Sequence, residues 1–403
     1  MIAPKLRFSE FKDEWIEKNL ESIADLTSSK RVHLSDYAPS GIPFFRGKEI
    51  TELKAGKKPT DVLYISNEQF EQIKSKYGVP KNGEMLITAV GTLANSYLVN
   101  LDYDFYFKDG NLIWFKNITE VPEFLELLLD AKKNDVLNSS IGSTQRALTI
   151  LNLNKLKFYF PSKEEQTKIA EFLSAVDDKI SQLSRQLELL NQYKKGVMQK
   201  IFSQEIRFKN DNGEDFGEWE EIQLKDFLTL TLRPVDKPNE NYHALGVRSH
   251  FKGLFNKYDS QPEKNSMDVL YEVFENDIVV NITFAWEGAM AIANKIHHKG
   301  LVSHRFPTYQ TDESKILLNF FRYIFIQKDF LAELQLCSPG GAGRNRVLSK
   351  KDFLEISILK PSVQEQAKIA EFLTAIDERI DHTTAQLTHT KQWKKGLLQQ
   401  MFV

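Results

Sequence analysis

One long segment occurs twice in this chain, and this repeat restricts the possible folds more than any other feature. Pro161–Phe202 and Pro361–Phe402 align without a gap at a spacing of 200 positions, and roughly half of the paired residues are identical. Solenoid-type repeats have periods of about 20–50 residues. The period here is much longer, so each repeat unit must contain a whole domain followed by the repeated segment.

The repeated segments have the apolar periodicity of a coiled coil. Their apolar residues recur at alternating steps of four and three, which places them along one seam of a helix. About 38 residues per helix correspond to about 57 Å at 1.5 Å per residue. In the first copy the seam residues are Ile169, Leu173, Val176, Ile180, Leu183, Leu187, Leu190, Val197 and Ile201, interrupted by Lys194. In the second copy they are Ile369, Leu373, Ile376, Ile380, Leu387, Leu397 and Met401, with Thr383, Thr390 and Lys394 as polar seam positions.

The residues before each seam predict where the helices begin. Ser162 and Ser362 follow a proline and are candidate N-caps, and Glu165 and Glu365 stand three positions later, as in a capping box. We expect the two helices to pair as an antiparallel coiled coil, with a variable domain at each end and a pseudo-twofold axis between them. The alternative is that each helix only closes the core of its own domain, but a nine-residue seam is longer than that role requires.

Similar segments also mark where each repeat unit begins and where it rejoins the helix. Residues 5–20 and 205–224 share an Arg-Phe pair, a Trp and a Leu, and the second copy carries additional residues that indicate a loop insertion. Residues 141–162 align without gaps to 341–362. The stretches between these similar segments match each other poorly, so the two domains have diverged while their connections to the helices have not.

Both divergent stretches combine strand and helix patterns. The predicted strands are Ile42–Arg46, Glu84–Val90, Tyr97–Leu101, Leu112–Phe115, Asp277–Thr283 and Ala289–Ala293. The predicted helices are Val121–Leu137 and Ile316–Leu336. The chain is therefore predicted to have a mixed α/β fold of the α+β type. Its expected divisions are a first domain at 1–160, a helix at 161–203, a second domain at 204–360 and a second helix at 361–403.

Composition is that of a folded protein with more than one core. The 403 residues are 41% hydrophobic and 27% charged. Cys337 is the single cysteine, which excludes an internal disulfide and favours a reducing compartment. The N-terminus lacks an apolar signal core, and no run approaches the ~20 apolar residues of a membrane span, so we expect a cytoplasmic protein. The net charge of −2 argues against a protein that coats nucleic acid, and strong DNA affinity would need a partner.

Short motifs recur around the two helices. Each helix begins with the pattern EQxKIAxFL followed by an aspartate, and the first divergent stretch contains IPFFRGKEI at 42–50, ITAVGT at 87–92 and GSTQRALT at 142–149. The helix motif consists of Glu165-Gln166, Lys168–Leu173 and Asp177, and again of Glu365-Gln366, Lys368–Leu373 and Asp377. In this combination, which covers essentially the whole chain, the sequence resembles the specificity (S) subunit of type I restriction–modification systems.

The resemblance implies a non-catalytic subunit that recognises DNA. Two target-recognition domains would each contact one half of a split, asymmetric double-stranded target, and the paired helices would set the distance between the halves. Two methyltransferase (M) subunits would bind this scaffold, and two restriction (R) subunits would join in some complexes. S-adenosylmethionine, ATP and Mg²⁺ are expected only on the partner subunits, so the chain itself is expected to hold no cofactor and no metal.

Motifs for catalysis are missing from the sequence. There is no GxxxxGK[ST] loop for ATP and no Asn-Pro-Pro-aromatic or Asp-Pro-Pro-aromatic motif of an adenine methyltransferase. GGAGR at 340–344 lacks the spacing of a nucleotide-binding loop, and His297-His298 lacks further ligands at a credible spacing for a metal. Trp286-Glu287-Gly288 is acidic, but no paired acidic and lysine pattern of a nuclease accompanies it.

Candidate DNA contacts are basic and small polar residues at strand ends and in loops. Arginine suits guanine and phosphate, glutamine suits adenine, and small polar groups allow close approach. In the first domain they are Arg46, Lys48, Thr88, Gly91, Thr92, Ser143, Thr144, Gln145 and Arg146. In the second they are Arg248, Ser249, Lys252, Asn281, Thr283, His304, Arg305, Arg344, Asn345 and Arg346. Each of these residues has the alternative role of stabilising its loop, and the paired Arg146 and Arg346 also suit a shared structural or phosphate role.

The helices carry candidate contacts for a partner. Phe172 and Phe372 lie outside the seam, and Lys194 and Lys394 recur within Lys-Lys-Gly. These four residues suit docking of an M subunit, with packing against the chain's own domains and solvated surface charge as alternatives. Two rival functions remain open at this point: an enzyme of which this is the specificity half, and a coiled-coil assembly scaffold that does not recognise a DNA sequence.

Overall fold

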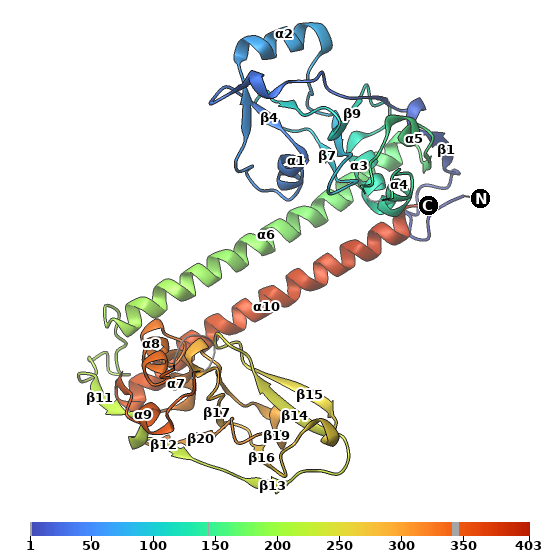
Figure 1. Ribbon diagram of the computed structural model, residues 1–403. Helices are drawn as coiled ribbons and strands as arrows, with labels where there is room; N and C mark the ends of the chain where they lie inside the picture. Colours follow the sequence, from blue (N-terminus) through green and yellow to red (C-terminus); the bar gives the residue numbers. More distant parts are fainter. Residues whose placement is uncertain (1, 144, 341–345) are drawn as a thin grey trace. The chain divides into compact units, whose positions relative to one another are not determined.

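The computed structural model describes residues 2–143, 145–340 and 346–403, which form two compact units (Figure 1). Unit 1 is Met1–Leu187 with Thr383–Val403, and unit 2 is Glu188–His382. The long helices α6 (Lys163–Phe202) and α10 (Val363–Met401) therefore contribute to both units. Among the described residues, no helix is both long enough and apolar enough to cross a membrane.

Unit 1 contains two four-stranded sheets. One is antiparallel with the order β2-β9-β6-β7, and the other has the order β3-β5-β4-β8 with β4 and β8 parallel. A separate antiparallel pair, β1 with β10, joins the start of the unit to the strand that leads into α6. The strands are β1 (Ile16–Asn19), β2 (Asp25–Thr27), β3 (Tyr37–Ala38), β4 (Ile42–Phe45), β5 (Leu63–Ile65), β6 (Met85–Thr88), β7 (Ser96–Leu98), β8 (Tyr106–Phe107), β9 (Leu112–Lys116) and β10 (Lys157–Phe160). The short helices are α1 (Gly47–Lys54), α2 (Asn67–Tyr77), α3 (Pro122–Ala131), α4 (Lys133–Asn138) and α5 (Ile150–Asn154).

Unit 2 repeats part of this plan. Its antiparallel sheet β12-β20-β17-β18 corresponds to the first sheet of unit 1, and its β11–β21 pair corresponds to β1–β10. The second sheet differs, because it has five strands in the order β13-β16-β19-β14-β15. The strands are β11 (Glu220–Gln223), β12 (Leu228–Leu230), β13 (Pro234–Asp236), β14 (Tyr242–Val247), β15 (Leu254–Ser260), β16 (Val269–Val273), β17 (Ile278–Val280), β18 (Met290–Ile292), β19 (Gly300–Val302), β20 (Thr308–Thr311) and β21 (Ser357–Lys360). The short helices are α7 (Leu318–Ile324), α8 (Lys328–Leu336) and α9 (Lys350–Leu354).

The two long helices pack together, as the seam predicts. In unit 1, Ile169 and Leu173 near the start of α6 share a core with Leu397 and Met401 near the end of α10. In unit 2, the end of α6 shares a core with the start of α10, which is the pairing of antiparallel helices. The same residues also close the cores of the globular parts, so the seam serves both roles that the sequence suggests. Figure 1 shows the start of α6 beside α3 in unit 1, where Phe124 of α3 belongs to this core.

The predicted helix starts are confirmed, but the capping glutamates have a different role. The backbone N–H of Glu165 donates to Ser162 Oγ at 3.3 Å, and that of Glu365 donates to Ser362 Oγ at 3.3 Å. The Glu165 carboxylate, however, accepts two hydrogen bonds from Arg7, at 2.8 and 2.7 Å. Arg207 contacts Glu365 in the same way. These ion pairs explain why the opening segment of each unit recurs together with the helix.

Two of the predicted helices are each divided in the structure. The predicted helix Ile316–Leu336 is α7 followed by α8, and the turn between them brings Phe330 against Phe321 with ring centroids 6.0 Å apart. The predicted helix Val121–Leu137 is α3 followed by α4, with a break at Lys132. In both cases the apolar spacing continues through the break, so periodicity alone cannot locate it.

A buried histidine makes unit 2 sensitive to acid. His297 is 5% exposed, and its Nδ1 accepts a hydrogen bond from the backbone N–H of Asn294 at 3.1 Å. Burial, together with nearby His243, lowers the pKa of His297 below its ordinary value of about 6.5. The unfolded chain therefore binds more protons than the folded chain as the pH falls below about 6.5, and stability decreases.

We expect His297→Asn to lose less stability than the native chain between pH 7 and pH 5. Asparagine offers an oxygen that can accept the same backbone hydrogen bond but does not titrate. Urea unfolding of both chains at the two pH values measures this difference. Equal losses in the native chain and the variant would assign the acid sensitivity to other groups.

Candidate nucleic-acid interface

Three of the predicted DNA-contact segments of unit 1 lie together. The segment after β6 pairs with the loop 141–147 through a bridge between Val90 and Ala147, and the Leu148 N–H donates to the Ala89 carbonyl at 2.9 Å. The start of α1 lies against the same segment, because a Cβ atom built on Gly47 would stand 3.5 Å from the Thr88 side chain. The sequence places these segments about 40–60 positions apart, and the fold brings them together.

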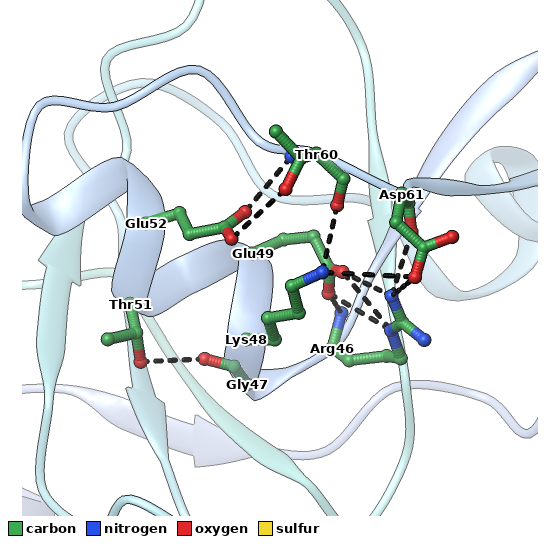
Figure 2. Close-up of polar contacts among 8 residues, drawn as sticks. All are labelled: Arg46, Gly47, Lys48, Glu49, Thr51, Glu52, Thr60 and Asp61. Carbon is green, nitrogen blue, oxygen red and sulfur yellow. Dashed lines mark hydrogen bonds and ion pairs between the residues drawn. The ribbon is translucent and has the colours of Figure 1, made fainter. Parts of the chain in front are cut away.

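Arg46 and Lys48 belong to an intramolecular network at the start of α1. Arg46 Nη2 donates to buried Glu49 at 2.5 Å and to the Asp61 carbonyl at 2.9 Å (Figure 2). Lys48 Nζ donates to the Thr60 carbonyl at 3.2 Å and lies 3.8 Å from the Asp61 carboxylate. The hydrogen bonds to Glu49 raise the pKa of the Arg46 guanidinium. Arg46 is thus held in place by Glu49, whereas Lys48 remains about half exposed and can reach a phosphate.

The loops of unit 1 differ in how far they expose their polar groups. Gly91 and Thr92 are exposed, and Gly91 has a φ of +81° that favours glycine. Thr88 is fully buried, and its hydroxyl bonds the Thr92 carbonyl and the Asn95 N–H, so it shapes the loop. Ser143 and Gln145 are exposed, while Thr144 lies outside the described residues.

Arg146 joins the exposed loop to the end of α4. Its Nε donates to Ser140 Oγ at 2.7 Å, and its Nη2 donates to the Leu137 carbonyl. The guanidinium nevertheless remains exposed. Arg146 therefore has a structural role in this loop and still presents positive charge to solvent, as a phosphate contact requires.

Unit 2 brings the corresponding segments together with the same backbone contact. The Leu348 N–H donates to the Ile282 carbonyl at 2.8 Å, as Leu148 does to Ala89 in unit 1. Arg346 differs from Arg146, because its guanidinium lies 5.2 Å from the ring centroid of Trp286. Arg344 and Asn345 lie outside the described residues. The Ile282 N–H donates to the Arg305 carbonyl, which places exposed Arg305 and its neighbour His304 beside this segment.

The remaining predicted residues of unit 2 surround one loop. Arg248 is exposed and lies over the Phe255 ring at 5.2 Å, and Lys252 is also exposed. Ser249 Oγ donates to Glu287 at 2.8 Å. Asn281 is buried, and its Oδ1 accepts a hydrogen bond from the backbone N–H of half-buried Thr283 at 3.1 Å. Asn281, like Thr88, is therefore a buried residue whose side chain bonds the backbone of a loop and stabilises its conformation.

The loops after β6 and β17 begin and end on corresponding backbone hydrogen bonds, but they differ in length and in side chains. Thr88 N–H donates to the Asn95 carbonyl, and Asn281 N–H donates to the Ala289 carbonyl. Six residues, 89–94, lie between the first pair and seven residues, 282–288, between the second. The second loop contains Phe284, Trp286 and Glu287, whereas the first has neither aromatic nor acidic residues, and sequence analysis does not select these three as DNA contacts. The second loop is one residue longer than the first between strands that otherwise correspond. This difference in length was the sequence signal that could have drawn attention to the loop.

The candidate partner contacts on the helices have contacts within the chain. Phe172 packs edge-to-face against Phe8 at 5.8 Å and against Trp393 at 6.0 Å, and Phe372 packs against Phe208 at 5.6 Å. Both phenylalanines remain half-buried. They join the opening segment of each unit to its helix, and part of their apolar surface stays open to a partner.

The two lysines each form an ion pair between the long helices. Lys394 Nζ donates to the Asp177 carboxylate at 2.6 and 2.7 Å in unit 1, and Lys194 bonds Asp377 in unit 2. Tyr323 donates to Asp377 at 2.8 Å, and burial raises the pKa of Tyr323 to about 12. Because these pairs use the aspartate of the repeated motif, they fix the register of the helix seam.

A charge swap tests the register pair of unit 1. We expect Lys394→Asp to destabilise unit 1 by about 1 kcal/mol, since both partners are partly exposed. The double variant Asp177→Lys with Lys394→Asp is expected to recover most of this loss. Urea unfolding of the native chain, the two single variants Asp177→Lys and Lys394→Asp, and the double variant forms a double-mutant cycle, which gives the coupling free energy of the pair. Additive effects of the two substitutions would contradict a register pair.

Metal binding has no support among the described residues, which contain no group of three or more His, Cys, Asp or Glu side chains able to hold an ion. The chemistry that the surfaces of the two units offer is hydrogen bonding and positive charge from loops on a fixed scaffold. Such groups bind phosphates and base edges.

Comparisons with known proteins agree on one family. Residues 12–192 and 217–390 both match the family model described as "Type I restriction modification DNA specificity domain". The chain is similar to a putative type I restriction enzyme MjaX specificity subunit of Methanocaldococcus jannaschii, with 23% identity over 98% of this chain and 94% of that protein. Its fold is similar to the crystal structure of a type I restriction–modification S subunit from M. genitalium, with a TM-score of 0.61, 16% identity and coverage of 100% and 99%. A structure on complex assembly and conformational transition of a type I system gives a TM-score of 0.52, 15% identity and coverage of 95% and 96%.

Proposed function

Since this chain belongs to the family of type I restriction modification DNA specificity domains, we propose that it is the specificity subunit of a type I restriction–modification complex. It binds a bipartite double-stranded target, with one half read by each unit. The observation that carries this proposal is the pair of loops after β6 and β17, which start and end on corresponding backbone hydrogen bonds but present different side chains. A common scaffold with different loop tips suits two different half-targets.

The chain acts as a non-catalytic scaffold in this proposal. Two M subunits bind it, R subunits join in some complexes, and the partners carry the adenine methylation and DNA cleavage. The target-recognition domains are residues 1–160 and 204–360, and the spacer helices are 161–203 and 361–403. The half-buried Phe172 and Phe372, which occupy matching places in the two copies, support docking of one partner twice.

The DNA contacts in this proposal come from the exposed members of the predicted set. Lys48, Gly91, Thr92, Ser143, Gln145 and Arg146 serve the first half, and Arg248, Lys252, His304 and Arg305, together with the half-buried Arg346, serve the second. Thr88 and Asn281 are buried and support the loops. Arg46 is bonded to Glu49 at the start of the helix that carries Lys48, and Ser249 Oγ donates to Glu287.

Methylome sequencing tests the proposal directly. Cells that express this chain with the M subunit of its own host are expected to carry methylated adenines in a two-part motif with a fixed gap. Cells with the M subunit alone serve as the control and should lack this motif. Methylation without sequence preference, or equal retention of random and target duplexes by the complex, would favour the coiled-coil scaffold instead.

A further inference from the structure

Unit 2 has a hollow of about 470 Å³ beside its candidate DNA contacts. The hollow lies over the five-stranded sheet and is lined by residues of β14, β15 and β19, and by the loop after β17. Three of its lining residues belong to the region already described, namely Ser249, Asn281 and Glu287. Phe284, which is 37% exposed, also lines it. Glu287 is the acidic residue among a lining that is otherwise aromatic, aliphatic and polar, apart from Lys257.

Hydrogen bonds hold the Glu287 loop in place before any ligand binds. Ser249 Oγ donates to Glu287 Oε2 at 2.8 Å, and the His250 N–H donates to the Glu287 carbonyl at 2.7 Å. Gly288 ends the loop with a φ of +74°, and a Cβ atom there would stand 2.8 Å from the Phe251 ring. Glu287 thus occupies a fixed position between two loops.

The carboxylate of Glu287 has unused capacity to accept hydrogen bonds. Within the described parts of the chain, Ser249 is the hydrogen-bond partner of the Glu287 carboxylate through Oε2, while Oε1 has none and the carboxylate forms no ion pair. Lys257 lines the same hollow, but its ammonium group lies over the Phe255 ring at 5.2 Å. A carboxylate with a free oxygen accepts hydrogen bonds and donates none.

The surroundings indicate which group Glu287 accepts from. Exposed basic side chains of the same unit, which suit phosphates, are Arg248, His250, Lys252, His304 and Arg305. A carboxylate is repelled by phosphates, so the DNA group that it can accept from is a donor on a base edge. In the major groove, the N4 amino group of cytosine is the donor that Glu and Asp side chains recognise.

We propose that Glu287 selects cytosine in the half-target bound by unit 2, by accepting a hydrogen bond from the cytosine N4 amino group. This inference rests on the proposed function. DNA that covers the hollow removes water from the carboxylate, and a base without a donor leaves this charge unpaired, which is costly. The site therefore acts mainly by rejecting other bases. The matching loop of unit 1, with Gly91, Thr92 and Leu93, has no acidic side chain, so this selection applies to one half only.

Methylome sequencing of Glu287→Gln tests the assignment. Glutamine keeps an oxygen that can accept from Ser249, but it replaces the acceptor-only carboxylate by an amide that also donates. We expect the preference for cytosine at one position of the second half-target to fall about tenfold or more, with the first half-target and the gap unchanged. Glu355→Gln is the matched control, because Glu355 is an exposed residue of unit 2 that pairs with Lys225 away from the hollow.

A duplex with a modified base identifies the atom. Pyrimidin-2-one lacks the amino group of cytosine, so placing it at the selected position should weaken binding by the native complex about tenfold and leave the Glu287→Gln complex nearly unaffected. An unchanged motif in Glu287→Gln, a selected adenine, or equal weakening of both complexes would overturn the inference. If the native complex shows no sequence preference at all, the proposed function itself fails, and this outcome is distinct from the others.

Discussion

Replacing Arg7 by alanine is expected to lower the free energy of unfolding of unit 1 by about 3–5 kcal/mol. The Glu165 carboxylate is 1% exposed and accepts both the Nε and Nη2 hydrogen bonds of Arg7, whose side chain is 13% exposed. Arg7 Nη2 also donates to the Asp13 carbonyl at 2.7 Å, which orders the opening segment. Without Arg7, a buried carboxylate at the start of α6 has no opposite charge, and this costs more than the ion pair itself contributes.

A second pair on the same helix provides the matched control. Lys168 bonds Glu10, but both side chains are about half exposed, so Lys168→Ala is expected to cost less than about 1 kcal/mol. The double variant Arg7→Ala with Glu165→Gln should recover part of the loss, because it removes the buried charge. Hydrogen exchange of peptides from the start of α6, followed in increasing urea, measures the stability of unit 1. Similar losses in Arg7→Ala and Lys168→Ala would show that Glu165 does not need its partner.

Local regularities in the sequence predict the two long helices of this protein well. The seam residues Ile169, Leu173 and Leu183 are buried as predicted, and Ser162 caps its helix, because these features depend on neighbours one or two turns away. The match between the repeats also carries information about contacts between residues that lie far apart in the sequence. Arg7 and Glu165 are separated by 158 positions, and so are Arg207 and Glu365, so the retention of both partners in both copies was a usable sign of contact.

The candidate interface depends on contacts that no local pattern contains. Thr88 and Thr92 stand in one short motif, yet one is buried and the other exposed, because only the pairing of β6 with its neighbours decides which side chain points inward. Phe172 lies outside the seam and therefore suggests a partner surface, whereas the fold places Phe8 and Trp393 against it. Glu287 belongs to none of the motifs that indicate DNA contacts, and it becomes a candidate only through the hollow that several separate strands form around it.

Replacing Gly142 by alanine is expected to reduce the affinity of the assembled complex for its DNA target by a factor of ten or more. Gly142 has a φ of +100°, and a Cβ atom there would stand 2.3 Å from the Gln145 carbonyl oxygen. Strain of this kind costs about 1–3 kcal/mol, so the loop 141–147 must rearrange, and it carries Ser143, Gln145 and Arg146. The loop is exposed and can rearrange locally, so unit 1 should stay folded and lose no more than about 1–3 kcal/mol of stability.

Gly110→Ala separates the effect of the clash from that of the backbone angle. Gly110 has a φ of +71°, but no atom lies within 4 Å of a Cβ atom built there, so alanine adds strain without a collision. Binding is measured with the full chain and its M partner on the native target and on duplexes in which one half-target is scrambled. We expect Gly142→Ala to lose discrimination against duplexes with a scrambled first half-target and to keep discrimination against duplexes with a scrambled second half-target. Gly110→Ala is expected to bind as the native chain does. Equal discrimination by Gly142→Ala and the native chain would remove the loop 141–147 from the interface.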